Sequence, residues 1–128
     1  MNAYLIDTHP LLWFLEGNPR LSEAGRALIQ YPGNQIFTSV ACLWEITTKI
    51  GLGKLHLPEP LSSVMAKMEA LGIGVLPLRP EHVLRSASLP LYHHDLFDRM
   101  LIAQALVEGM PVVSKDAIFE EYGLEWIW

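Results

Sequence analysis

Short apolar segments rich in β-branched residues alternate with segments of helical periodicity along this chain, and this alternation limits the folds available to it. Strands that are joined through helices form parallel sheets with right-handed crossovers. The predicted strands cover residues 3–6, 35–38, 73–76, 111–114 and 124–128. The sequence therefore predicts an α/β fold with a central parallel sheet.

Capping and helix-breaking residues mark the helices between these strands. Ser22 and Ser39 are suited to N-caps, Pro10 fits a first helical turn, and Gly51 and Gly109 follow two helix ends. The predicted helices cover residues 10–17, 22–30, 40–50, 61–71, 80–88 and 96–108. No internal repeat or linker interrupts the pattern, so we expect a single domain over residues 1–128.

Composition indicates a compact globular protein and argues against a surface that coats nucleic acid. Hydrophobic residues make up 51% of the chain, charged residues 18%, and the net charge is −5. Broad nucleic-acid surfaces are basic, so any contact with RNA must be local. The single cysteine, Cys42, indicates a buried thiol in a reducing compartment. Without a signal-like N-terminus or a long apolar stretch, we expect a cytoplasmic protein with no membrane segment.

Acidic residues fall at the carboxyl-terminal edge of the predicted sheet. Asp7 directly follows the first strand, and Asp116 follows the fourth. Asp98 lies in the first turn of the helix before the fourth strand, and that end of the helix reaches the same edge. Glu45 lies further along the helix after the second strand, but helical side chains tilt back toward the N-terminus. Since ligands bind at this edge of parallel sheets, we predict that the four carboxylates converge there.

A cluster of carboxylates requires compensating cations. Two carboxylates about 4 Å apart repel by roughly 4 kcal/mol at an effective dielectric constant of about 20, so without compensation they protonate or separate. Hard cations such as Mg²⁺ or Mn²⁺ prefer oxygen ligands and leave positions open for a phosphate and a water molecule. The pattern therefore favours metal-assisted phosphodiester hydrolysis.

Each acidic residue also has an ordinary structural interpretation. Asp95 can cap the helix in which Asp98 is a favourable first-turn charge, and Asp7 and Asp116 can cap the segments that follow them. Glu45 can pair with the lysine four residues later. The metal-site interpretation is favoured because the residues share one edge and Glu45 lies in a strongly apolar segment, where an unpaired charge is costly.

The same residues lie in segments that resemble VapC-type toxins of the PIN-domain ribonuclease family, and the resemblance spans nearly the whole chain. The most specific segment covers residues 89–105 and includes His93-His94-Asp95-Leu96-Phe97-Asp98-Arg99. The other matching segments are Leu5-Ile6-Asp7-Thr8-His9, Trp44-Glu45-Ile46 after Ser39, and Val113-Ser114-Lys115-Asp116.

This resemblance implies a three-layer α/β/α fold, with about five parallel strands flanked by helices, and a metal-dependent endoribonuclease that cleaves single-stranded RNA. The implied cofactor is Mg²⁺, with Mn²⁺ as an alternative, and the implied ligands are Asp7, Glu45, Asp98 and Asp116. The resemblance further implies the toxin of a type II toxin–antitoxin system, a homodimer and inhibition by a cognate antitoxin. Second-tier residues that contact the substrate or support the ligands are Ser114, Arg99, Asp95 and Thr8.

Within the best-matching segment, two residues differ from the common family pattern. His94 and Leu96 stand where relatives commonly carry arginine and proline, which affects substrate contacts and loop rigidity more than metal binding. His93 and His94 are adjacent and have no neighbouring cysteine, so we do not expect a zinc site.

Other functional classes lack their characteristic motifs. The chain has no glycine-rich phosphate-binding loop, which argues against a nucleotide-binding domain. A phosphoacceptor domain would carry an aspartate after the third strand, where this chain has Pro77 and Leu78. The remaining alternative is a catalytically inactive PIN-like module that acts by binding protein or RNA.

Overall fold

Parallel strand pairing organises the computed structural model, which describes residues 2–128. The strands are β1 (Asn2–Ile6), β2 (Asn34–Ser39), β3 (Gly74–Leu76), β4 (Val112–Val113) and β5 (Trp126–Ile127). They form one sheet in the order β3-β2-β1-β4-β5, and every pairing is parallel. In the register of the central strands, Leu5 lies between Phe37 and Val112. The predicted parallel sheet is therefore confirmed.

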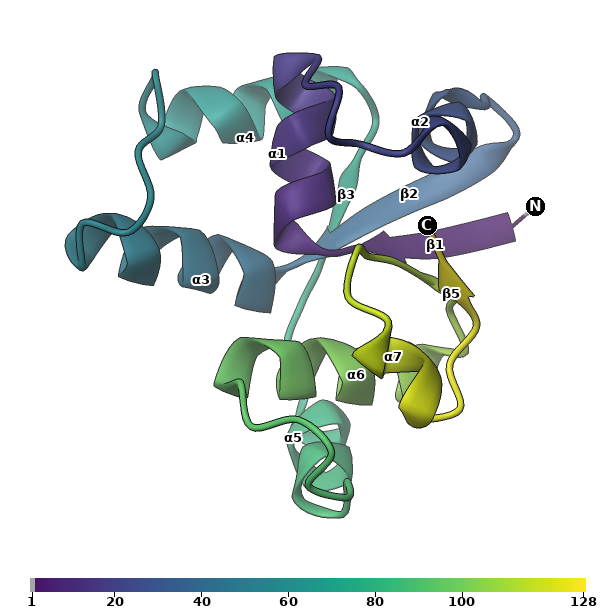
Figure 1. Ribbon diagram of the computed structural model, residues 1–128. Helices are drawn as coiled ribbons and strands as arrows, with labels where there is room; N and C mark the ends of the chain where they lie inside the picture. The colour runs from purple at the N-terminus through teal and green to yellow at the C-terminus, as the bar shows by residue number, and fades with distance from the viewer. Residues whose placement is uncertain (1) are drawn as a thin grey trace.

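Helices cover both faces of this sheet, which confirms the expected three-layer α/β/α fold. The helices within residues 2–128 are α1 (Thr8–Glu16), α2 (Glu23–Gln30), α3 (Val40–Gly51), α4 (Leu61–Ala70), α5 (Pro80–Ala87), α6 (Leu96–Glu108) and α7 (Ile118–Glu121). Figure 1 shows α1, α2 and α4 on one side of the sheet and α5, α6 and α7 on the other, with α3 extending from the end of β2. None of the helices described is both long enough and apolar enough to cross a membrane.

Neighbouring residues of the central strands point into two separate cores. Leu5 and Val112 are fully buried among residues of α6 and α7. Ile6 and Val113 are equally buried among residues of α1 and α4. Burial on both faces explains why these strands are continuously apolar rather than alternating with polar residues.

Two differences from the sequence-based prediction lie close to predicted ligands, and the last strand is shorter than predicted, at Trp126–Ile127 instead of residues 124–128. The first helix begins at Thr8 rather than near Pro10, because the Asp7 carboxylate accepts a hydrogen bond from the Thr8 N–H at 2.8 Å. Helix α7 was not predicted, because four residues are too few to show helical periodicity. An Asp116 oxygen accepts from the N–H of Ile118 at 3.0 Å, at the start of this short helix.

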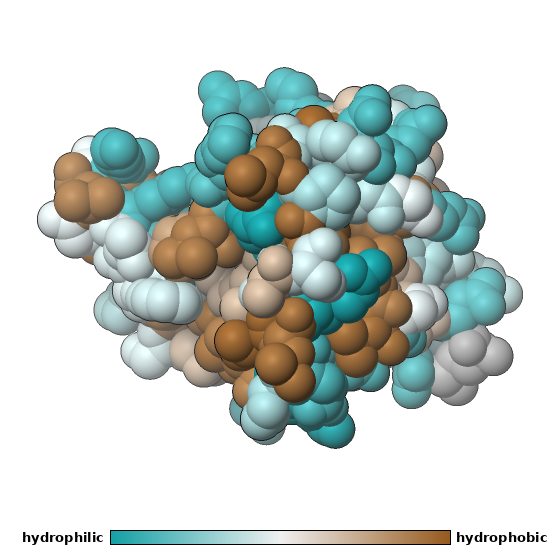
Figure 2. Space-filling view, turned by 90° about the horizontal axis from the view of Figure 1, so that it is seen from below, coloured by the Kyte–Doolittle hydropathy of each residue, from teal (hydrophilic) through white to brown (hydrophobic). Residues whose placement is uncertain are grey.

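Large apolar side chains remain exposed around α5 and the segment that follows it. We refer to Val83, Leu84, Leu91, Tyr92 and Leu96 as the α5 face; the exposed fraction reaches 73% at Leu84 and 70% at Leu91. Figure 2 views the molecule from below, the side on which α5 lies in Figure 1, and shows hydrophobic residues gathered there. A contiguous apolar patch of this kind is typical of an interaction site, whereas single exposed apolar residues are common on any protein.

A buried polar contact fixes α6 relative to the ends of β2 and β3. Gln104 of α6 is fully buried; its side-chain oxygen accepts a hydrogen bond from the Ser39 hydroxyl, and its amide donates to the Pro77 carbonyl at 3.2 Å. The Ser39 hydroxyl also caps α3. The contact therefore sets the position of α6, which carries Asp98, relative to α3, which carries Glu45.

Replacing Gln104 with leucine is expected to lower the free energy of unfolding by about 2 kcal/mol, because the Ser39 hydroxyl and the Pro77 carbonyl lose their partner in the interior. Urea denaturation of the two proteins measures the difference. Gln30→Leu, at an exposed position of α2, is the matched control and should leave the free energy of unfolding unchanged. A Gln104→Leu protein as stable as the wild type would contradict this role.

Candidate metal centre

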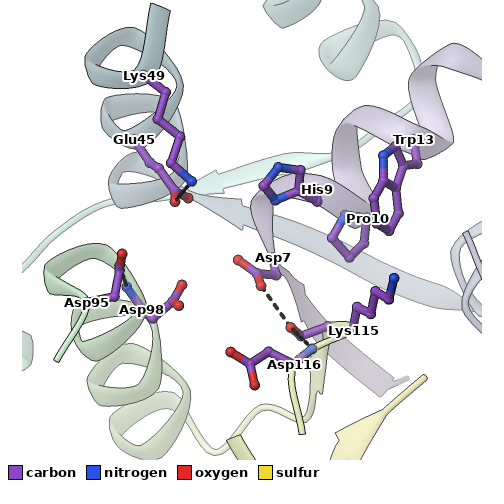
Figure 3. A pocket seen from close by; sticks show the side chains of 11 residues that line it. Asp7, His9, Pro10, Trp13, Glu45, Lys49, Asp95, Asp98, Lys115 and Asp116 are labelled. Atoms are coloured by element: carbon purple, nitrogen blue, oxygen red, sulfur yellow. Dashed lines mark hydrogen bonds and ion pairs between the residues drawn. The ribbon is translucent and has the colours of Figure 1, made fainter. Parts of the chain in front are cut away.

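A pocket of about 330 Å³ lies at the carboxyl-terminal edge of the sheet. Its walls come from the junction of β1 and α1, from α3, from the start of α6 and from the segment after β4 (Figure 3). The lining residues are Asp7, His9, Pro10, Trp13, Glu45, Lys49, Asp95, Asp98, Ser114, Lys115 and Asp116. The structure thus brings all four predicted carboxylates into one pocket.

Three of these carboxylates are close enough to bind one cation. One oxygen each of Asp7, Glu45 and Asp98 lies within 4.8 Å of the other two. Figure 3 shows Asp7 and Asp98 extending toward the same space from opposite walls, with Glu45 above them. Three negative charges at such separations destabilise the pocket unless a positive charge or a proton compensates them.

Ser114 holds Asp7 in place and connects it to the segment that carries Asp116. The Ser114 hydroxyl is buried and donates to Asp7 Oδ2 at 2.8 Å, while the Thr8 N–H donates to Asp7 Oδ1. The same hydroxyl accepts a hydrogen bond from the N–H of Asp116 at 3.1 Å. Ser114 therefore acts as a support for the carboxylates, one of the two roles expected of it.

Glu45 is buried and has a partner at each carboxylate oxygen. The Thr8 hydroxyl donates to Glu45 Oε1 at 2.5 Å, and the Lys49 ammonium lies 2.7 Å from Glu45 Oε2. The expected pairing with the lysine four residues later is therefore present. Burial lowers the pKa of Lys49, but its contact with Glu45 outweighs that effect and leaves the pKa above its ordinary value. Lys49 thus supplies one positive charge to an otherwise acidic wall.

Asp95 and Arg99 flank Asp98, and their side chains form hydrogen bonds with backbone groups. Asp95 caps α6 by accepting a hydrogen bond from the Asp98 N–H at 2.9 Å. The Arg99 guanidinium donates to backbone carbonyls instead of lining the pocket; these belong to Ser86, Leu89, Pro90 and His93. These contacts fit the supporting role expected of Arg99, and its contact with substrate stays a prediction.

His93 is a site residue that the sequence analysis considered only as a zinc ligand and set aside. Its Nε2 lies 2.6 Å from Asp98 Oδ2 and 3.8 Å from Asp116 Oδ2. The proximity to Asp98 fits a separation of five residues. The proximity to Asp116 depends on tertiary structure, so no local sequence signal could have revealed it.

Burial and mutual repulsion favour the protonated forms of two of these carboxyls. Burial raises the pKa of Asp98 to about 7, the charge of Asp7 adds to the rise, and the contact with His93 opposes it. Burial also raises the pKa of Asp7, against the hydrogen bonds from Ser114 and Thr8 and together with the charge of Glu45. A site built from oxygen donors with too little positive charge fits a hard divalent cation such as Mg²⁺ or Mn²⁺.

The sequence matches the PIN domain family over residues 4–124, and the chain belongs to that family. Since PIN domains are generally nucleases, the family agrees with a hydrolytic metal centre. No curated protein sequence matches this chain.

Solved structures of toxin–antitoxin complexes share the fold at low sequence identity. A chain of VapBC2 from Rickettsia felis, bound to a DNA fragment from its promoter, is 14% identical with a TM-score of 0.69, and the match covers 98% of this chain and 97% of that chain. A toxin–antitoxin complex from Klebsiella pneumoniae is 16% identical with a TM-score of 0.65, covering 98% and 96%. VapBC-1 from nontypeable Haemophilus influenzae is 14% identical with a TM-score of 0.63, also covering 98% and 96%.

The raised pKa of Asp98 predicts how stability depends on pH in the presence of a chelator. Its pKa is about 7 in the folded protein and ordinarily 3.8, so folding binds a proton between these values. The contribution of Asp98 to the free energy of unfolding is therefore most favourable below about pH 4, and it is lost as the pH rises to about 7. We expect the melting temperature of Asp98→Asn in chelator to exceed that of the wild type at pH 8 but not at pH 4.

Divalent cations should reverse this loss. Adding Mg²⁺ at about 100 times its dissociation constant should stabilise the wild type by up to about 3 kcal/mol at pH 8. The effect should be much smaller at pH 5, where protons compete for the carboxylates, and at either pH in Asp98→Asn. Differential scanning calorimetry measures these shifts, and an equal Mg²⁺ effect in wild type and Asp98→Asn would contradict the assignment.

Proposed function

We propose that this chain is a divalent-cation-dependent endoribonuclease that acts as the toxin of a type II toxin–antitoxin system. The observation that carries the proposal is the convergence of Asp7, Glu45 and Asp98, whose oxygens lie within 4.8 Å of one another in a pocket of a PIN-domain fold. Asp116 completes the acidic set on the pocket wall that follows β4. Single-stranded RNA is the proposed substrate, and the cytoplasm the proposed compartment.

A bound Mg²⁺ or Mn²⁺ would polarise the scissile phosphate and lower the pKa of the attacking water. The carboxylates of Asp7, Glu45 and Asp98 would hold the cation, while Thr8 and Ser114 keep two of these carboxylates oriented through hydrogen bonds. Lys49 and Lys115 line the same pocket and offer positive charge to the phosphates of an RNA strand. Local charges of this kind make RNA contact compatible with the acidic composition of the chain.

A cognate antitoxin is the proposed protein partner. The proposal is supported by the similar folds of one chain of VapBC2 and one chain of the Klebsiella pneumoniae toxin–antitoxin complex, each matched over nearly its whole length. The expected homodimer is a separate proposal, for which the exposed α5 face offers an apolar surface.

Cleavage of a single-stranded RNA in Mg²⁺ is expected to fall by at least about 100-fold in Asp7→Asn and in Asp98→Asn, because each variant loses a cation ligand at the reacting phosphate. Chelator should abolish cleavage by the wild type, and Mg²⁺ or Mn²⁺ should restore it. The rate of appearance of labelled RNA fragments is the measurement.

The matched control is Glu121→Gln, which removes an exposed carboxylate of α7 outside the pocket. Its cleavage rate should equal that of the wild type. Equal cleavage by wild type, Asp7→Asn and Asp98→Asn would reject the mechanism and point to a contaminating nuclease. A folded wild type that binds Mg²⁺ but cleaves no RNA would favour the binding-module alternative.

The homodimer can be tested by introducing a charge on the α5 face. Light scattering should give the wild type about twice the chain mass of 14.4 kDa. Leu84→Glu should reduce this mass to that of one chain, because a carboxylate would be buried without a partner at the interface. Leu71→Glu, at a similarly exposed apolar position at the end of α4, should leave the mass unchanged. A dimer unaffected by Leu84→Glu would exclude the α5 face as its interface.

A further inference from the structure

The ring of His93 lies near two carboxylates, those of Asp98 and Asp116. Its Nε2 and one oxygen each of Asp98 and Asp116 lie within 4.8 Å of one another. Asp98 also belongs to the set formed with Asp7 and Glu45. This edge of the sheet therefore has two donor sets that share one carboxylate, one with oxygen donors only and one with a nitrogen donor.

The backbone around His93 is fixed from two sides. The Tyr122 hydroxyl accepts a hydrogen bond from the His93 N–H at 2.8 Å and donates to the Pro90 carbonyl, also at 2.8 Å. Arg99 Nη1 donates to the His93 carbonyl at 3.2 Å. Contacts from Tyr122, directly after α7, and from Arg99 of α6 thus hold the backbone of the residue that bears the imidazole.

Two other histidines lie nearby and provide a comparison. His9 lines the same pocket but packs against Trp13, with the ring centroids 5.7 Å apart and the ring planes tilted by 46°. His94 is adjacent in sequence and exposed. Neither joins a set of three potential metal ligands within residues 2–128. Only His93 combines a ring nitrogen with two carboxylates at coordinating distance among these histidines.

We propose that His93 is the nitrogen ligand of a second cation position, formed with Asp98 and Asp116, and that it makes this position prefer Mn²⁺ over Mg²⁺. The proposal rests on the proposed function, in which Asp7, Glu45 and Asp98 hold the first cation, and it extends that function to metal selectivity. A carboxylate shared by two cations is the arrangement expected in two-metal hydrolase sites. Imidazole nitrogen favours first-row transition metals, whereas Mg²⁺ prefers a shell of oxygen atoms.

His93 coordinates a cation as a neutral imidazole. The Nε2 lone pair binds the cation while the ring carries its proton on Nδ1, so the ligand is the neutral imidazole. Asp116 adds a negative charge that the position formed with Asp7 and Glu45 does not use. Asp116 is more exposed than Asp98, which leaves an open side for water or phosphate.

Electron spin-echo envelope modulation of bound Mn²⁺ tests the proposal directly. Less than one equivalent of Mn²⁺ is added to the wild type in excess Mg²⁺, without RNA. We expect a ¹⁴N coupling that becomes a ¹⁵N coupling when histidine alone is labelled with ¹⁵N. This measurement needs no variant, so it does not depend on whether a substitution at His93 folds.

Four variants then identify the histidine. His93→Gln and His93→Asp should lose the nitrogen coupling, while His9→Gln and His94→Gln should retain it. In His93→Asp, which restores an oxygen ligand, the affinity ratio of Mn²⁺ to Mg²⁺ should fall by at least about tenfold, since even residues that only support a ligand commonly have effects of this size.

The outcomes separate this proposal from the proposed function. Bound Mn²⁺ without nitrogen coupling in the wild type, or coupling that persists in His93→Gln, would overturn the role of His93 while leaving RNA cleavage intact. Nitrogen coupling in a protein that cleaves no RNA would support the ligand and refute the nuclease. A wild type that binds no divalent cation would overturn both.

Discussion

Repulsion among carboxylates at one edge of the sheet is the constraint to which the surrounding structure responds. The parallel order of β1 and β4 and the packing of α6 on the sheet bring Asp7 and Asp98 together regardless of their charge. Nearby groups reduce the resulting cost: Ser114 donates to Asp7, and Lys49 pairs with Glu45. The compensation is incomplete, since the pKa of Asp98 remains raised to about 7. The remaining excess of negative charge favours the binding of a cation in the pocket.

Structural and chemical roles coincide in the same side chains. Asp7 caps α1 through one oxygen while its other oxygen receives the Ser114 hydroxyl. Asp95 caps α6 at the helix turn that positions Asp98. The capping interpretation and the metal-site interpretation of the sequence are therefore not exclusive. Helix N-termini at this edge also present backbone N–H groups that stabilise negative charge, which helps the fold tolerate its own acidic pocket.

Features that depend on local periodicity and chain order were accessible from the sequence, and those that depend on tertiary contacts were not. The parallel sheet and the edge shared by Asp7 and Asp98 follow from alternating strands and helices, and the structure agrees with both. Helix α7 was not predicted because it is a single short turn. The start of α1 was predicted too late because a single cap residue determines it. The proximity of His93 to Asp116 could not be predicted because it depends on the fold of the segment after β4. The role of Arg99 toward backbone carbonyls likewise depends on the course of residues 86–93.

The hydrogen bond from Ser114 to Asp7 joins residues 107 positions apart in the chain. During translation, the first strand therefore leaves the ribosome long before the residue that orients its carboxylate has been made. The acidic pocket is assembled only when nearly the whole polypeptide is available, so a truncated product or a proteolytic fragment lacks a complete centre. Under the proposed toxin function, this late assembly delays any damage to the producing cell until synthesis is almost finished.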